Sequence, residues 1–127
     1  MNKKVLLVFA VVPIVAAAVL VRPQIDPAAP TLMKAKTGYA HRLLDAVVVE
    51  DFDVIQDQAF RLKAVAETAD WRAAESQEFV RETEAFIHAA DRLYEAAKAK
   101  DGDGTALAYM DVTLSCVHCH RHLRHAR

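Results

Sequence analysis

The chain has very few residues that interrupt a helix. It contains three glycines and four prolines in 127 residues, and no proline follows Pro30. Because proline breaks the interior of a helix, its absence from the rest of the chain predicts a helical body. The alternation of apolar and polar residues that marks a half-buried strand is also missing. These absences argue against a fold built on a β-sheet.

Cysteine is absent from the first 115 residues of the chain. Both cysteines lie in the terminal run SCVHCHRHLRHAR, residues 115–127, together with four of the six histidines. The sequence also lacks a Ser/His/Asp array, a pair of catalytic carboxylates and a phosphate-binding loop. We therefore predict that the protein is not an enzyme and that its chemistry lies in the terminal run.

A long uncharged run occurs at the N-terminus. Lys3 and Lys4 precede seventeen uncharged residues, 5–21, and Arg22 ends the run. This pattern predicts export, with residues 1–22 acting either as a cleaved signal peptide or as an anchor that stays in the membrane. In both cases we expect the body of the protein in the periplasm or its equivalent.

The body beyond residue 22 is weakly acidic. The whole chain has 16 Lys and Arg against 17 Asp and Glu, and three of those cations but none of the acids lie in residues 1–22. The body therefore has a net charge of −4, which argues against nucleic acid as a partner. Three of the four prolines lie in residues 23–30, which predicts a stiff linker ahead of a single domain over 31–127.

The domain is predicted to consist of four helices. Apolar or small residues recur at every third or fourth position, and the connections are short. The predicted helices span residues 31–49, 50–71, 76–100 and 105–127. This organisation favours an all-α fold, an antiparallel four-helix bundle. In the last helix the expected packing stripe is Leu107, Met110, Leu114 and Val117.

Cys116, Cys119 and His120 form the pattern C-x-x-C-H, which attaches a c-type haem. Two thiols at this spacing reach the two vinyl groups at one edge of the porphyrin. The next residue then supplies the proximal nitrogen to the iron. We therefore predict one haem c per chain, held covalently at both cysteines, with His120 as the proximal iron ligand.

Other interpretations of the cysteine pair remain open. A disulfide between residues so close in sequence closes almost no loop and contributes little stability. A thioredoxin-type redox pair needs the N-terminus of a helix beside a βαβ unit, whereas this pair falls late in a helix. A zinc site from Cys116, Cys119, His122 and another histidine is the strongest alternative, because four ligands of the right type are available.

The position of the motif in the last helix points to a family. The run DVTLSCVHCHRHLR, residues 111–124, resembles the haem-bearing helix of the class II c-type cytochromes, the cytochrome c-prime family. The matching residues outside the C-x-x-C-H motif are Asp111, Val112, Ser115 and Arg124. This chain has Leu123 where the family usually has an aromatic residue. Residues 47–71, which end in a tryptophan, are similar to the family's second helix.

The resemblance implies a four-helix haem domain over residues 31–127, with Arg124 near the haem. It also implies redox proteins as partners, and a homodimer, since family members often pair through their first two helices. In low-spin members a methionine early in the first helix covers the distal face of the iron. In five-coordinate members an apolar residue stands there and leaves the iron open to NO or CO.

Met33 is the candidate for the distal position, and an apolar cover or another ligand such as His41 are the alternatives. The main hypothesis is thus an exported monohaem cytochrome for single-electron transfer. A five-coordinate haem protein that binds NO or CO is the first alternative, and a Cys/His zinc-binding module is the second.

Overall fold

The computed structural model describes residues 29–68 and 76–125 of the chain. They form four α-helices, which are α1 (Ala29–Val48), α2 (Phe52–Ala66), α4 (Gln77–Lys98) and α5 (Gly102–His125). No strand occurs in these ranges, so the predicted all-helical class is confirmed for them. The signal or anchor expected over residues 1–22 lies outside the described residues.

The boundaries of the first two helices differ from the prediction. Residues 29 and 30, assigned to the linker, belong to the first turn of α1, where a proline is tolerated because its missing N–H has no partner in a helix. Helix α2 ends at Ala66, where Glu67 caps it, earlier than the expected end at residue 71. Of the helices in the two described ranges, none combines the length and the apolar composition needed to cross a membrane.

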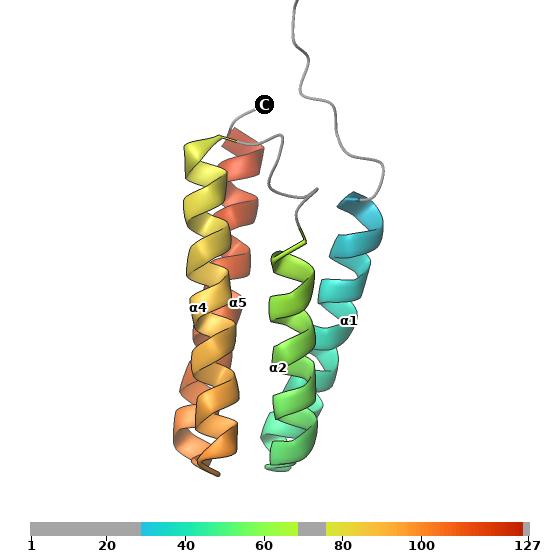
Figure 1. Cartoon of the computed structure of the whole chain (residues 1–127), viewed down its shortest axis with the longest axis vertical. Helices are drawn as coiled ribbons and strands as arrows, with labels where there is room; N and C mark the ends of the chain where they lie inside the picture. Colours follow the sequence, from blue (N-terminus) through green and yellow to red (C-terminus); the bar gives the residue numbers. More distant parts are fainter. Residues whose placement is uncertain (1–28, 69–75, 126–127) are drawn as a thin grey trace, which may run out of the picture.

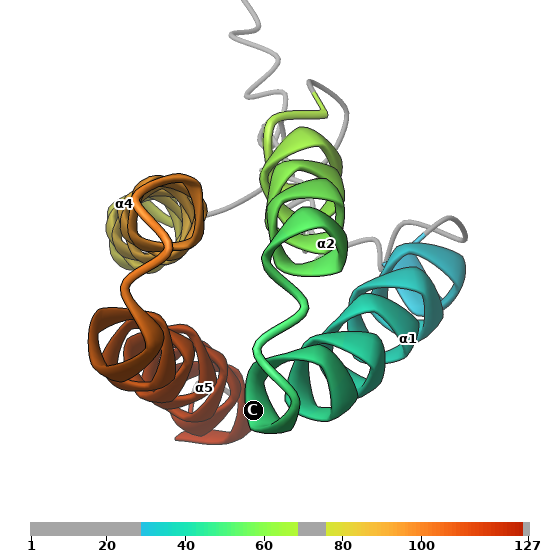
Figure 2. The same ribbon diagram turned by 90° about the horizontal axis from the view of Figure 1, so that it is seen from below.

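Consecutive helices run in opposite directions, as expected for an antiparallel bundle (Figure 1). Seen along the helices, α1, α2, α4 and α5 follow one another around the bundle (Figure 2). Each helix packs on its neighbour in the chain, and the contact between α1 and α5 is the smallest of these contacts. The beginning of α1 and the end of α5 lie at the same end of the bundle (Figure 1), so the C-x-x-C-H motif lies at the level of the first half of α1.

Two turns of the same form connect the helix pairs. Glu50 and Lys100, each two residues after the end of α1 or α4, adopt left-handed backbone angles, with φ of 54° and 55°. The next residue in each turn is an aspartate that caps the following helix. Asp51 Oδ1 accepts a hydrogen bond from the Val54 amide at 3.2 Å, and Asp101 Oδ1 accepts one from the Gly104 amide at 2.9 Å.

The DGDG run spans residues 101–104. Its two glycines belong to the start of α5 and are not a break before this helix. The sequence predicted a break there and a helix from residue 105, whereas α5 begins at Gly102 because Asp101 caps it. A Cβ atom at Gly102 would collide with the carboxylate of Glu50, which lies in the turn between α1 and α2. This carboxylate is the end of a flexible, exposed side chain, so it can move aside for a larger residue at Gly102.

The core lies mainly between α2 and α4, and here the predicted stripes are confirmed. The apolar or small residues that recur at every third or fourth position of α4 are all buried, namely Phe79, Thr83, Phe86, Ala90, Leu93 and Ala97. In α2 those residues are the half-buried Phe52 and the buried Ile55, Ala59, Leu62 and Ala66. The largest fully buried apolar side chains are Leu43, Ile55, Leu62, Leu93 and Val112. At about 25 cal/mol per Å² of apolar surface removed from water, this packing is the main favourable contribution to folding.

The stripe predicted for the last helix is wrong. Leu107, Met110, Leu114 and Val117 are 42–70% exposed, and the buried residues of α5 are Thr105, Ala108 and Val112. A phenylalanine in a bundle helix is expected to pack in the core, but the side chain of Phe60 in α2 is 63% exposed. Helix α5 therefore packs through small residues and leaves a longer apolar stripe on its outer side.

Candidate functional site

The two cysteines and the histidine of the motif lie in the second half of α5. Cys116 and Cys119 are one helical turn apart, so their side chains leave the helix on the same side. Cys116 and Cys119 do not form a disulfide with each other; Cys116 is exposed and Cys119 is half-buried. His120 follows directly and is exposed. Two thiols and an imidazole are thus presented together on one short segment, as the sequence predicted.

Lys36 of α1 lies near both thiols. Its Nζ stands 4.5 Å from the centre of the Phe86 ring of α4, so the side chain reaches across the bundle. Burial lowers the pKa of the Lys36 ammonium, and the two cysteines oppose this shift. Although Cys116 as a residue is exposed, desolvation of its sulfur by the surrounding protein raises the pKa of the thiol, and the charge of Lys36 acts in the opposite direction. The side of α5 that carries the thiols therefore faces α1.

Met33 lies on the same part of α1. It is half-buried, and the Thr37 hydroxyl donates a hydrogen bond to its carbonyl oxygen at 2.9 Å. A contact between α5 and α1 shows at which level of the bundle Met33 lies. The hydroxyl of Tyr109 in α5 donates a hydrogen bond to the Ala40 carbonyl of α1 at 3.3 Å. Cys116 lies seven residues after Tyr109, and Met33 lies seven residues before Ala40. Since the two helices are antiparallel, Met33 and Cys116 both lie roughly 10 Å along their helices from this contact.

The remaining residues singled out from the sequence are more dispersed. Arg124 is exposed in the last turn of α5, and His41 is exposed on α1. His122 Nε2 lies 3.4 Å from the hydroxyl of Ser76, the residue that caps α4. This contact joins the end of α5 to the start of α4, near the motif.

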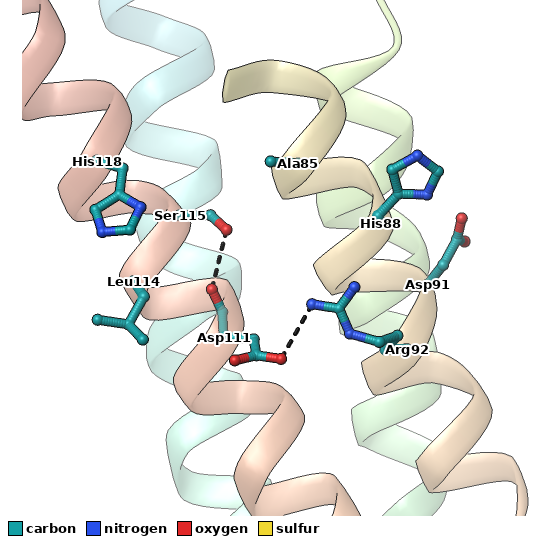
Figure 3. Close-up of a pocket in the computed structure, with 8 residues that line it drawn as sticks. All are labelled: Ala85, His88, Asp91, Arg92, Asp111, Leu114, Ser115 and His118. Atoms are coloured by element: carbon teal, nitrogen blue, oxygen red, sulfur yellow. Dashed lines mark hydrogen bonds and ion pairs between the residues drawn. The ribbon is translucent and has the colours of Figure 1, made fainter. Parts of the chain in front are cut away.

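His118, the second variable residue of the motif, lies away from the thiols, in an open groove between α4 and α5 (Figure 3). The groove also contains the ion pair between Arg92 and Asp111, with 3.0 Å between Nη2 and Oδ2. Ser115 donates its hydroxyl to the Asp111 carbonyl at 3.0 Å. Asp111 thus links α5 to α4 through Arg92, whereas the hydrogen bond of Ser115, which also matches the resembled family, stays within α5.

The sequence reasoning missed the position of Lys36 in the site. Lys36 was visible only as an interruption of the apolar stripe of the first helix, and its place beside the thiols depends on how α1 packs on α4 and α5. As for zinc, no group of three or more His, Cys, Asp or Glu side chains that could hold a metal ion occurs within residues 29–68 and 76–125.

Comparison of the chain with models of protein families, with curated proteins and with solved structures finds no match.

Proposed function

We propose that the protein is an exported monohaem c-type cytochrome that carries single electrons. The observation that supports this most directly is the set of donors on α5. Both cysteines of the chain and the histidine that follows them lie on one segment of a four-helix bundle, and the side with the thiols faces α1. A thiol pair and an imidazole at this spacing are the donors that a c-type haem requires.

The side chains of the C-x-x-C-H motif fit a c-type haem. Cys116 and Cys119 would hold a single haem through thioether bonds to its vinyl groups, and His120 would bind the iron. When bound, haem supplies a one-electron couple whose potential depends on the axial ligands and on the surrounding polarity. Arg124, exposed on the last turn of α5, would neutralise a haem propionate.

The sixth position of the iron separates electron transfer from gas binding. We assign it to Met33, because the Tyr109–Ala40 contact puts Met33 at the level of Cys116 on the facing helix. A methionine ligand raises the potential of the iron and suits outer-sphere electron transfer. If Met33 does not ligate, the iron is five-coordinate and binds NO or CO, which is the second candidate function.

The remaining parts of the proposal concern location and partners. The uncharged run 5–21 behind Lys3 and Lys4 supports export to the periplasm, with the run either cleaved or kept as an anchor. Redox proteins are the proposed partners, and no nucleic acid is expected, because the body has more acids than bases. The protein is proposed as a member of the class II cytochromes c on the residues of its last helix.

The experiment that tests this proposal is a visible spectrum of the protein after expression with a cytochrome c maturation system. We expect a Soret band that persists through denaturing electrophoresis, because the haem is covalent. Absence of the Soret band would overturn the haem assignment, and zinc analysis of the same sample would then test the Cys/His zinc module.

The same sample decides the sixth ligand. We expect a low-spin spectrum in both redox states and no change when CO is added to the ferrous protein. A high-spin spectrum that shifts immediately with CO would replace electron transfer by gas binding at an open iron.

A further inference from the structure

Helix α5 carries an apolar stripe on the side that faces away from the bundle. Leu107, Met110, Leu114 and Val117 are 70%, 56%, 48% and 42% exposed. Their spacing of three, four and three residues keeps them on one face of the helix. The buried residues of α5, Thr105, Ala108 and Val112, lie on the opposite face. We call the four exposed residues the outer stripe.

The outer stripe has an acid at one end and a base at the other. Asp103 lies four residues before Leu107, and Arg121 lies four residues after Val117, so both continue the same face of α5. Both residues are exposed. An apolar stripe with opposite charges at its two ends can pair with the same stripe of a second, antiparallel copy. At each end of such a pair the acid of one copy meets the base of the other.

We propose that the outer stripe is the interface of a homodimer in which two α5 helices pack antiparallel about a two-fold axis. With the axis beside position 112, Leu107 meets Val117 of the second copy and Met110 meets Leu114. Asp103 then meets Arg121 at both ends of the interface. All these pairs are symmetric about the same position, as a two-fold axis requires.

The residues beside the stripe are compatible with this pairing. Asp111 lies near the axis and would approach Asp111 of the second copy. Its carboxylate is already paired with Arg92 at 3.0 Å, which reduces the repulsion (Figure 3). Thr113, on the other side of the stripe, is an exposed uncharged residue that fits close to the axis.

A second copy is favoured over the chain's own N-terminal segment as the occupant. The run 5–21 is apolar, but the charges beside it, Lys3, Lys4 and Arg22, are all positive, so that segment has no acid to meet Arg121. This interface also differs from a dimer through the first two helices, which the family resemblance implies. Four side chains make a small contact beside the roughly 800 Å² per partner of a standard interface, so we expect a dissociation constant on the order of 10 µM.

The test is sedimentation equilibrium of the full chain in a density-matched mild detergent, with a reducing agent present. The single variants Asp103→Arg and Arg121→Asp each place like charges at both ends of the antiparallel pair, so each should weaken self-association about tenfold or more. The double variant restores both ion pairs and should dimerise like the unmodified chain. An equimolar mixture of the two single variants should form a heterodimer, because all four facing charges are then opposite.

Two further variants test the apolar part of the interface. Leu114→Asp puts a charge in the middle of the outer stripe and should abolish the dimer, with the helix content in circular dichroism unchanged. Phe60→Asp is the matched control, since Phe60 is 63% exposed on α2, outside the stripe; it should leave the dimer intact.

The proposal does not depend on haem, and the measurement is made on the chain with and without it. An unmodified chain that stays monomeric up to about 0.5 mM would overturn the proposal, because this is far above the expected dissociation constant. A dimer that persists in Leu114→Asp, or a double charge variant no better than the single ones, would overturn it equally.

Discussion

The ammonium group of Lys36 lies 4.5 Å from the centre of the Phe86 ring, so a cation of α1 reaches α4 through the interior of the bundle. The face of an aromatic ring attracts a cation, which offsets part of the cost of removing the charge from water. Lys36 continues the face of α1 that also carries the buried Leu43. A charged residue therefore occupies a packing position next to the two thiols.

Replacing Lys36 by Met should change how stability depends on pH. Burial lowers the pKa of Lys36 in the folded state, so between that pKa and the ordinary value of 10.5 the unfolded chain holds a proton that the folded chain has released. The unfolded state binds more protons in this window, and stability rises as the pH rises through it. Lys36→Met should lose this rise, and at neutral pH it should be more stable by roughly 1 kcal/mol.

Urea unfolding of the haem-free chain at a series of pH values measures this effect. Lys34→Met is the matched control, because Lys34 lies on the same helix but is exposed. The control should keep the pH dependence of the unmodified chain. An unchanged pH dependence in Lys36→Met would show that its ammonium is not the group responsible.

Removing both thiols should abolish covalent attachment of haem. The double variant Cys116→Ala/Cys119→Ala should give no haem stain on a denaturing gel, whereas each single variant keeps one thioether bond and stains more weakly. Ser115→Ala, next to the motif, removes only the hydroxyl that donates to Asp111 and serves as the control. Full stain in the double variant would contradict the assignment of the cysteines.

Replacing Met33 by Ala should open the sixth position of the iron. We expect a change from a low-spin to a high-spin spectrum, binding of CO to the ferrous protein, and a lower reduction potential, because a thioether ligand raises it. Met110→Ala is the matched control, since Met110 is 56% exposed on the outer side of α5. If Met33→Ala leaves spectrum and potential unchanged, Met33 is an ordinary packing residue.

Truncation of Leu93 should destabilise the bundle strongly. Leu93 is fully buried between the helices, and Leu→Ala at such positions costs about 2–5 kcal/mol through lost transfer energy and a residual cavity. Leu44→Ala removes the same atoms from a side chain that is 48% exposed, and should cost less than about 1 kcal/mol. Chemical denaturation of both variants as haem-free chains measures the difference. Equal losses would mean that the core is not where the structure puts it.

The sequence predicted most of the helical framework because its signals are local. Ser76 is the first residue of the predicted helix 76–100 and a residue type that favours the cap position, and its hydroxyl accepts a hydrogen bond from the Phe79 amide at 3.3 Å. Asp51 lies at the start of the predicted helix 50–71, where an acid is favourable, and it caps α2. The glycines after Asp101 were harder to interpret, because glycine signals a break until a cap and a close neighbour are known.

The candidate site also has one part that local sequence signals predict and another part that they do not. The C-x-x-C-H motif can be identified from five consecutive residues, since their spacing on a helix is enough to put both thiols on one side. The partners across the bundle come from α1, about eighty residues earlier in the chain. Whether Met33 or Lys36 stands opposite the thiols depends on the rotation of α1 about its axis, which no local pattern specifies.

The sequence by itself determined that the described part of the chain is helical, where its helices lie to within about five residues at each end, and that thiols and imidazole share the end of the last one. Only the tertiary structure decided which side of that helix is inside. The stripe of Leu107, Met110, Leu114 and Val117 is the more apolar face, yet the bundle buries Thr105, Ala108 and Val112. Periodicity reveals that an apolar face exists, whereas the packing of small residues against α4 determines where the neighbouring helix lies.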